Sequence, residues 1–445
     1  MKIVKLWAVF AVCTLIVSAQ TQKPPPMPVA IDAAKIYLDE QDGFSAGALV
    51  RTAWDKNGEL QAARLEAAKA RARLRQAGLR PNPVLQIERT TGRVVGDSTD
   101  RGFSVGVEMP LERGQKRLAR ITLAEAELRF VEAEVLEKER RLAAEVLQAY
   151  ATALAAWREL ETLEDILRLD TETARFVQIR VNEGETAPLE LNLLQAEVER
   201  LRAKRTLAEA SLGVALSRLK ILAGLAPEDL LRVREKLTGG LLREPPASLA
   251  AATDIALRER PDFQLAKLAE EVAAAGQQAA IAQARFDWII SGGYSFLGSS
   301  YQDSPVGQVK DRSSTVTFGV SIPLPVFNKN NAALQEEAAV AILQAQRRRA
   351  FLENVIRNEV AAAFNLYESS NQALFAFEQG VIKRTKANIQ TIRAAYELGE
   401  FRILDLLQQQ RRLLEAQQDL TAILAMRYRA QAELLIAIGA KDLGK

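Results

Sequence analysis

The chain carries few of the side chains that usually perform chemistry. Its 445 residues include 56 Asp and Glu and 59 Lys and Arg, but no His and a single Cys. Histidine-based metal sites and histidine general bases are therefore absent, which puts any catalytic interpretation at a disadvantage. With only four Met as well, nothing in the sequence points to a metal relay. We predict no enzyme, and no catalytic, metal-binding or cofactor-binding residues.

The acidic residues that stand out flank two glycines of a repeated sequence. RVNEGETAPLELNLL begins at Arg180 and AYELGEFRILDLLQ begins at Ala395, so Gly184 aligns with Gly399 at an offset of 215 residues. VGVEMPL and FGVSIPL, which contain Gly106 and Gly319, repeat at an offset of 213 residues. Two landmarks with nearly the same offset indicate a duplicated unit of roughly 210 residues.

Each unit is expected to contain a helix, two strands and two further helices. Uninterrupted helical sequence predicts a helix of roughly 65 to 70 residues, about 100 Å long, over residues 115–183. Its apolar residues recur at sevens, as in a coiled coil. Residues 331–397 predict a similar helix that contains Gly380, and single helices are expected over 45–78, 188–222, 253–286 and 403–438. Pairs of short helices stacked end to end would match one long helix, giving four parallel columns.

Alternating apolar and polar residues predict the strands. The pattern is clear over 103–109 and 315–322, and over 288–296 it places Trp288, Tyr294 and Phe296 on one face. The loops 92–102 and 297–313 are expected to connect the strands of each pair. Two interpretations remain open: half-buried sheet in a soluble domain, or strands of a membrane barrel completed by other copies. In a barrel, Phe318 and Val320 would also meet lipid, whereas the polar lumen would be lined by Ser291, Gly293, Ser295, Thr317 and Ser321.

The N-terminus has the pattern of an export signal. Lys2 and Lys5 precede an apolar run that ends at Val17, and Ser18 and Ala19 supply the small residues that a signal peptidase recognises. A membrane anchor, the alternative, needs about 20 apolar residues. Cys13 lies within the run, and whether it is lipidated stays open. A formal net charge of +3 argues against a nucleic-acid partner.

These patterns divide the chain into successive segments. We predict a signal peptide over 1–19, a Pro-rich N-terminal tether over 20–44, a first repeat over 45–224, an inter-repeat linker over 225–250, a second repeat over 251–439 and a tail over 440–445. Each repeat comprises a helix, a strand pair and a long helical hairpin.

Several segments together resemble the outer membrane factor family, the TolC-like channels. They are KNGELQAARLEAAKARARLRQAGLRPNPVL from Lys56, the tips Arg-x-x-x-Gly and Tyr-x-x-Gly that end at Gly184 and Gly399, and GVSIPLPVFNKNNA from Gly319. The resemblance covers nearly everything after Ser45. PLPVFNKNN most resembles the branch that serves heavy-metal efflux pumps of the resistance-nodulation-division type.

The resemblance implies a mainly α fold with a small β part. Three chains, with four antiparallel strands each, would form a homotrimeric twelve-stranded β-barrel in the outer membrane, continued through the periplasm by an α-helical tunnel. The channel would be the passive exit duct of a tripartite efflux system, with a periplasmic adaptor, an inner-membrane pump and outer-membrane lipid as partners. The alternatives are a periplasmic coiled-coil adaptor and an exported structural protein.

The resemblance also suggests roles for residues near the two glycines. The adaptor-docking tips would be Glu183, Gly184, Glu185, Leu398, Gly399 and Glu400. Asp405 matches an aspartate that constricts the closed aperture, Gln408 stands where a second aspartate occurs, and Glu190 is the equivalent of Asp405 in the first repeat. Independently of the family, each glycine would allow the chain reversal, and Asp405 would equally suit a solvated carboxylate near a helix N-terminus.

Overall fold

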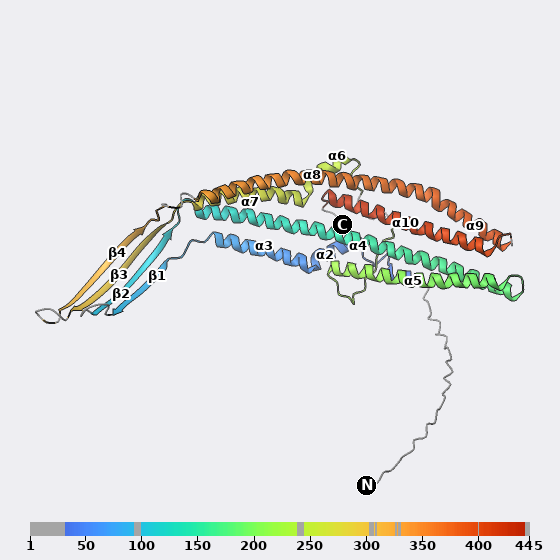
Figure 1. The fold of residues 1–445 in the computed structure, drawn as a ribbon, viewed down its shortest axis with the longest axis horizontal. Coiled ribbons are helices and arrows are strands. Elements are labelled where there is room, and N and C mark those ends of the chain that lie inside the picture. Colours follow the sequence, from blue (N-terminus) through green and yellow to red (C-terminus); the bar gives the residue numbers. More distant parts are fainter. Residues whose placement is uncertain are drawn as a thin grey trace, which may run out of the picture.

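The computed structural model describes residues 32–92, 99–237, 244–301, 307, 309–324, 327, 331–398 and 400–440. The predicted signal peptide and Cys13 lie outside these residues. The described chain is an elongated bundle of helices that carries one sheet at one end (Figure 1). No helix within these ranges combines the length and apolar character that crossing a membrane would require.

The long helix α4, Lys116–Asn182, has 67 residues and forms the axis of the first repeat. On its flank, α2 (Ala46–Lys56) and α3 (Gly58–Ala77) precede the sheet, and α5 (Pro188–Ala223) returns from the far end. Asn57 joins these pieces end to end, because its side chain accepts a hydrogen bond from Leu60 N and donates one to Leu222 O at 3.1 Å. Two short helices thus match one long helix, as predicted.

The second repeat has the same plan. Its long column comprises α8 (Ala332–Ala376), a π-helical turn (Phe377–Ile382) that contains Gly380, and α9 (Lys383–Glu397). Beside it lie α6 (Leu249–Glu259), α7 (Pro261–Gln283) and α10 (Ile403–Ala437). Arg260 connects the short helices, since its Nη1 donates to Ala437 O at 3.2 Å.

Two single helices of the sequence-based prediction are in fact broken. The predicted helix 45–78 is α2 and α3, which are separated at Asn57 because its side chain caps the new helix. The predicted helix 253–286 is α6 and α7, separated at Arg260 because Pro261 has no N–H to continue α6. Both breaks lie where α5 or α10 meets the column end to end.

The sheet consists of β1 (Val84–Gly92), β2 (Thr99–Leu111), β3 (Trp288–Tyr301) and β4 (Val309–Ser321) in that order, with antiparallel neighbours. The strands are longer than predicted. Residues 297–301 and 309–313, which we expected in a loop, stay paired, with Leu297 opposite Ser313. Likewise β2 begins at Thr99, inside the predicted loop 92–102. Backbone pairing continues beyond the point where apolar alternation ends.

The register places the apolar residues of all four strands on one face. Ile87 pairs with Val105, Val105 with Tyr294, and Tyr294 with Val316. Within one chain this face is open: Phe318 is 85% exposed and Ile87 64%. Ser291, Ser295 and Thr317 alternate with these residues and lie on the opposite face. The sheet therefore has one apolar and one polar surface.

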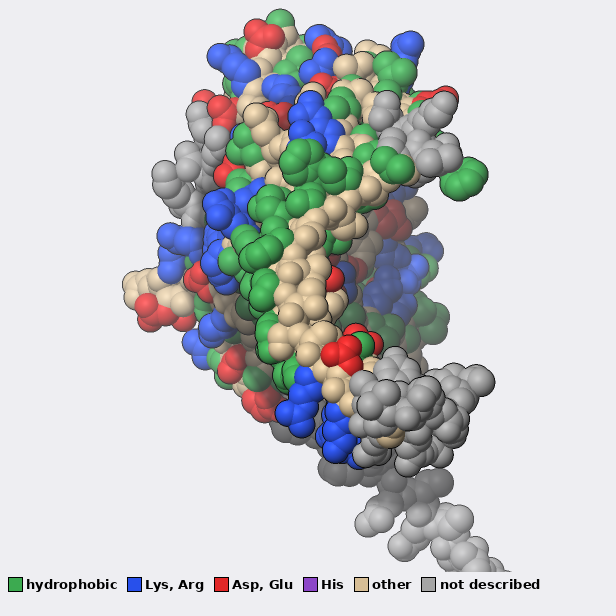
Figure 2. All heavy atoms as spheres, turned by 90° about the vertical axis from the view of Figure 1, so that its left-hand side faces the viewer, with side chains coloured by type: hydrophobic (Ala, Val, Ile, Leu, Met, Phe, Trp, Pro, Cys, Tyr) green, Lys and Arg blue, Asp and Glu red, His purple; other side chains and the backbone are tan. Residues whose placement is uncertain are grey.

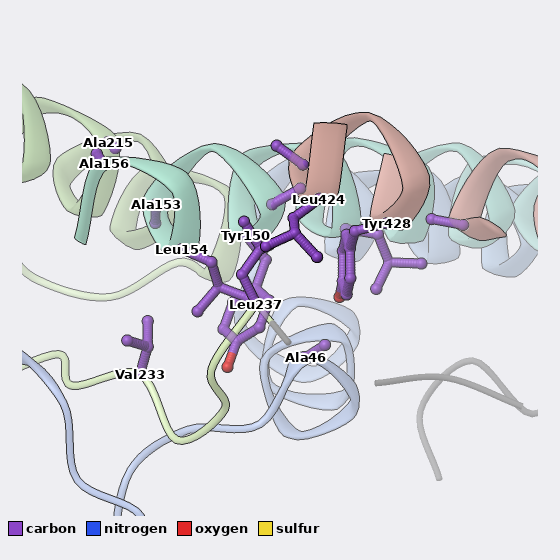
Figure 3. Close-up of a cluster of buried hydrophobic side chains, with 14 of the residues drawn as sticks. Ala46, Tyr150, Ala153, Leu154, Ala156, Ala215, Val233, Leu237, Leu424 and Tyr428 are labelled. Atoms are coloured by element: carbon purple, nitrogen blue, oxygen red, sulfur yellow. The ribbon is translucent and has the colours of Figure 1, made fainter. Parts of the chain in front are cut away.

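The main core lies midway along the helices, around Tyr150, Leu154, Tyr428 and Leu424 (Figure 3). The segment before α2 and the linker after α5 pack here, as parallel bridges join Val233 to Leu38 and Phe44. A short helix, α1 (Ala33–Tyr37), docks against α4, where Glu164 accepts hydrogen bonds from the N–H groups of Ala33 and Ala34. The predicted tether, 20–44, therefore differs from the structure over its second half.

Candidate functional site at the helical tips

The first tip reverses the chain between α4 and α5 through a Schellman motif. Gly184 has a φ of +80°, a conformation that side chains disfavour. Its N–H donates to Val181 O at 3.1 Å, and Glu185 N–H donates to Arg180 O at 2.9 Å. Glu183, Gly184 and Glu185 are all exposed. The Arg180 guanidinium lies 3.4 Å from the Glu185 carboxylate, so an ion pair spans the reversal.

The second tip uses the same backbone bond between α9 and α10. Glu400 N–H donates to Ala395 O at 2.9 Å, and these residues lie 215 positions after Glu185 and Arg180. Leu398 is 78% exposed and Glu400 is also exposed. Gly399 lies outside the described residues. The two tips differ in side chain, since Ala395 cannot form the ion pair that Arg180 forms.

A small hydrophobic cluster, separate from the main core, holds the two tips together. It brings together residues of α4, α5, α9 and α10: Val177, Leu191, Leu194, Tyr396, Ile403, Leu406 and Leu407. Figure 1 shows these four helices reaching the same end of the molecule, opposite the sheet. The described residues among the predicted docking residues therefore lie at one end of the molecule, beside this shared cluster.

Within this cluster a hydrogen bond joins the two repeats. Tyr396 is 5% exposed, and its phenolic oxygen lies 3.4 Å from Glu190 Oε2. Burial, followed by the nearby negative charge of Glu190, raises the pKa of Tyr396, so the phenol stays protonated and donates. Glu190, predicted as a gate residue, thus has a partner in the other repeat. In the sequence Tyr396 stands out only as part of a Tyr-x-x-Gly pattern, which does not predict this contact.

The structure places Asp405 in the first turn of α10, where it acts as a cap. Its Oδ2 accepts a hydrogen bond from Arg402 N at 3.2 Å. Gln408 lies one turn later and is exposed, while Asp405 is half-buried. Among the described residues no hydrogen bond joins Asp405, Gln408 and Glu190 to one another. The three predicted gate residues share one end of the molecule without forming a single cluster.

A buried charged group, which no sequence pattern predicted, lies further from the tips. Glu197 of α5 accepts a hydrogen bond from Arg411 Nη2 of α10 at 2.9 Å and another from Arg200 Nε at 3.1 Å. Burial pushes its pKa upward, but the hydrogen bonds from these arginines outweigh burial and leave the pKa below its ordinary value. This ion pair is a second link between the repeats.

Asp170 of α4 lies beside this ion pair and is 1% exposed. Its Oδ1 has no hydrogen-bond partner among the described residues. Burial, and then the charge of Glu197, raise the pKa of Asp170 to about 7. The sequence offers one indication that Asp170 is buried. It lies three residues after the buried Leu167, on the same face of a helix whose apolar residues pack inward. That signal does not distinguish a buried aspartate from a solvated one.

The described residues contain no group of three or more His, Cys, Asp or Glu side chains arranged to hold a metal ion. What the tips offer is a surface of exposed carboxylates and one exposed leucine, supported by polar links between the two repeats. Such an arrangement can dock another protein.

Comparison with known proteins gives concordant matches. The family described as "Outer membrane efflux protein" matches residues 49–225 and 252–440. The cobalt-zinc-cadmium resistance protein CzcC of Cupriavidus metallidurans is 25% identical over 389 residues, which cover 84% of this chain and 85% of that protein. The cation efflux system protein CusC of Escherichia coli O157:H7 is 26% identical over 404 residues, 88% and 85% of the two chains.

Solved structures share the fold. A crystal structure of CusC superposes with a TM-score of 0.71 at 22% identity, covering 89% of this chain and 92% of that one. The outer-membrane channel OprN gives a TM-score of 0.69 at 19% identity, with 93% and 96% covered. At these sequence identities the superpositions establish only that the fold is shared. That fold has a sheet at one end and long paired helices.

Proposed function

The chain belongs to the outer membrane efflux protein family, and from that premise we propose that three copies assemble into one exit duct, which docks a periplasmic adaptor at its helical tips. The outer membrane is where the protein acts, with its helices extending into the periplasm, and it is the channel component of an efflux system. Because the family match spans both repeats, the alternatives of a periplasmic adaptor and a structural coiled coil are not favoured.

The sheet is the observation that carries the proposal of a trimer. Among the described residues, no further strand pairs with the outer edges of β1 and β4. In hydrocarbon an unsatisfied backbone group costs several kcal/mol, so a membrane sheet must close on itself. A four-stranded sheet with an apolar and a polar face can close with strands from other copies, and three copies would give twelve strands, which lies within the range of outer-membrane barrels.

The helical part is suited to docking a periplasmic adaptor. At 1.5 Å per residue, the 67 residues of α4 span about 100 Å. The tips lie at the end opposite the sheet, and Glu183, Glu185, Leu398 and Glu400 are exposed there. A periplasmic adaptor bound to this surface would connect the duct to an inner-membrane pump, which we take to be of the resistance-nodulation-division type. Transport through the duct would be passive, since the pump supplies the energy.

We take heavy-metal cations as the cargo. The support comes from two relatives that align over most of both chains, a cobalt-zinc-cadmium resistance protein and a protein of a cation efflux system. Selection among metals would reside in the pump and adaptor, whereas the channel would supply the route through the outer membrane.

Cell fractionation and electrophoresis test the assembly. The protein should be found in outer membranes and should run on an unheated gel as a species of about three chains that heating converts to monomer. A monomer in the soluble periplasm would overturn the proposal. For the cargo, a metal-sensitive strain that lacks its own channel should regain metal resistance only when this chain is expressed with its matching adaptor and pump.

A further inference from the structure

The sheet sorts its charged side chains by face. Arg101 of β2 pairs with Gly298 of β3, which pairs with Arg312 of β4. In the next row toward the helices, Phe103 pairs with Phe296. Residues two apart on a strand share a face, so Arg101 and Arg312 lie on the apolar face, one row beyond these aromatic rings.

Two more cations extend this group. Arg89 pairs with Phe103, and Lys310 pairs with Ser300, which is two residues beyond Gly298 on the same face. All four side chains are exposed, and no ion pair joins them to a carboxylate of the described residues. We call them the cationic row: Arg89, Arg101, Lys310 and Arg312. By the same register, the described strand carboxylates lie on the opposite, polar face: Glu88, Glu108 and Asp311.

The cationic row occupies one end of the apolar band. The band extends from Phe103 and Phe296 to Trp288 beside the helices, and the strand cations of this face lie at the end away from the helices. At the other end Arg113, which follows β2, lies over the Trp288 ring. Figure 2 shows Lys and Arg side chains gathered beyond the lower end of a hydrophobic stripe. With the helices in the periplasm, this end faces the outer leaflet and the cell exterior.

The row also contains a shallow hollow. A depression of about 450 Å³ is lined by three cations, by one acidic residue and by four other residues: Arg101, Lys310, Arg312, Asp311, Phe296, Gly298, Ser299 and Ser300. Gly298 has no side chain to fill the space between the two arginines. Two inter-strand spacings separate Arg101 from Arg312, roughly 10 Å at the backbone. That span suits a headgroup with more than one anionic group, and the guanidinium fork matches phosphate oxygens bidentately.

We propose that the cationic row binds the phosphate groups of a phosphorylated lipid in the outer leaflet, whose acyl chains lie along the adjoining apolar band. The cations adjoin the apolar band that would face the membrane interior. This position favours a lipid as the ligand over a protein or a free anion. The inference rests on the proposed function, because it requires the sheet to lie in the outer membrane.

Binding of lipid A to the purified detergent-solubilised assembly tests the proposal. The triple variant Arg101→Ser, Lys310→Ser, Arg312→Ser should bind diphosphorylated lipid A roughly 100-fold more weakly, at about fivefold per cation. The matched control, Arg51→Ser, Arg73→Ser, Arg347→Ser, removes three exposed cations from the helices and should bind as the parent does. Dephosphorylated lipid A should bind both variants and the parent with the same, weaker affinity.

Conductance in planar bilayers, measured on the same preparations, distinguishes failure of the lipid site from failure of the proposed channel function. A conducting triple variant with unchanged lipid A affinity would overturn the lipid site and leave the channel function intact. Equal binding of phosphorylated and dephosphorylated lipid A to the parent would also overturn the lipid site, as would full competition by inorganic phosphate at equal concentration. Loss of conductance in the parent itself would instead contradict the proposed function.

Discussion

The Tyr396 hydroxyl oxygen lies 3.4 Å from the Glu190 carboxylate, so a residue of the second repeat donates to one of the first at the end of the molecule opposite the sheet. The two residues are not equivalent under the duplication, because Val181 stands in the first repeat where Tyr396 stands in the second. Opening the tips by moving α9 and α10 away from α5 would break this bond. The first repeat therefore has no tyrosine with which to form the equivalent bond to Asp405.

Replacing Tyr396 with Phe removes this bond while retaining the ring in the small cluster. A hydrogen bond to a charged group contributes about 1.5 to 3 kcal/mol, so we expect faster amide exchange in the tips and higher resting conductance in planar bilayers. Tyr367→Phe, a change at a half-buried tyrosine of α8, is the control and should leave both unchanged. Unaltered exchange and conductance in Tyr396→Phe would show that the bond does not hold the tips closed.

Substitutions at Asp405 can distinguish two roles of its carboxylate, the cap of α10 and the predicted gate. Asp405→Ala should raise resting conductance and remove the cap, at a cost of about 0.5 to 2 kcal/mol. Asp405→Asn retains an oxygen that can accept from Arg402 N but loses the charge. Raised conductance in both variants indicates a gate that acts by charge. If conductance rises only in Asp405→Ala, Asp405 acts only as a cap. If conductance rises in neither variant, Asp405 has no gating role.

Gly184 tests the backbone of the first tip. A Cβ there would meet nothing within 4 Å, so Gly184→Ala isolates the strain of a φ of +80°. We expect destabilisation by about 1 kcal/mol, measured by thermal unfolding and by amide exchange at the tip. Gly213→Ala, in α5, also meets nothing within 4 Å and has helical backbone, so it should stabilise by about 0.5 to 1 kcal/mol. Equal effects of the two changes would contradict the role assigned to the turn.

Asp170 makes stability depend on pH. Its pKa is about 7 in the folded chain and 3.8 as the ordinary value, so between these values the folded state binds more protons. The free energy of unfolding should therefore fall as pH rises from about 4 to 7, by an amount on the order of a few kcal/mol. Asp170→Asn should remove most of this slope and be more stable than the parent at pH 8.

Asp165→Asn is the control for this titration. It lies on the same helix with its side chain 66% exposed, and it should retain the parent's pH slope. Unfolding by chemical denaturant at a series of pH values measures both variants. A parent whose stability is flat between pH 4 and 7 would contradict the buried, unpartnered carboxyl.

Local sequence determined the elements that depend on local periodicity. The glycine- and proline-free run before Glu183 predicts α4 to within a residue, and alternation around Phe103 and Trp288 predicts which face of each strand is apolar, because both signals come from neighbours along the chain. The glycine of the first tip belongs to this class, since its left-handed turn is a property of a few residues.

Only the tertiary structure decided how these pieces meet. The breaks at Asn57 and Arg260 have local causes, the Asn57 cap and Pro261, but the contacts of these two residues with the ends of α5 and α10 join distant segments. Tyr396 reaches Glu190 because a cluster from four helices brings residues 206 positions apart together. The elevated pKa of Asp170 arises from burial beside Glu197, and the cationic row arises from strand register. Each of these features depends on contacts between residues far apart in the sequence, which local sequence patterns do not predict.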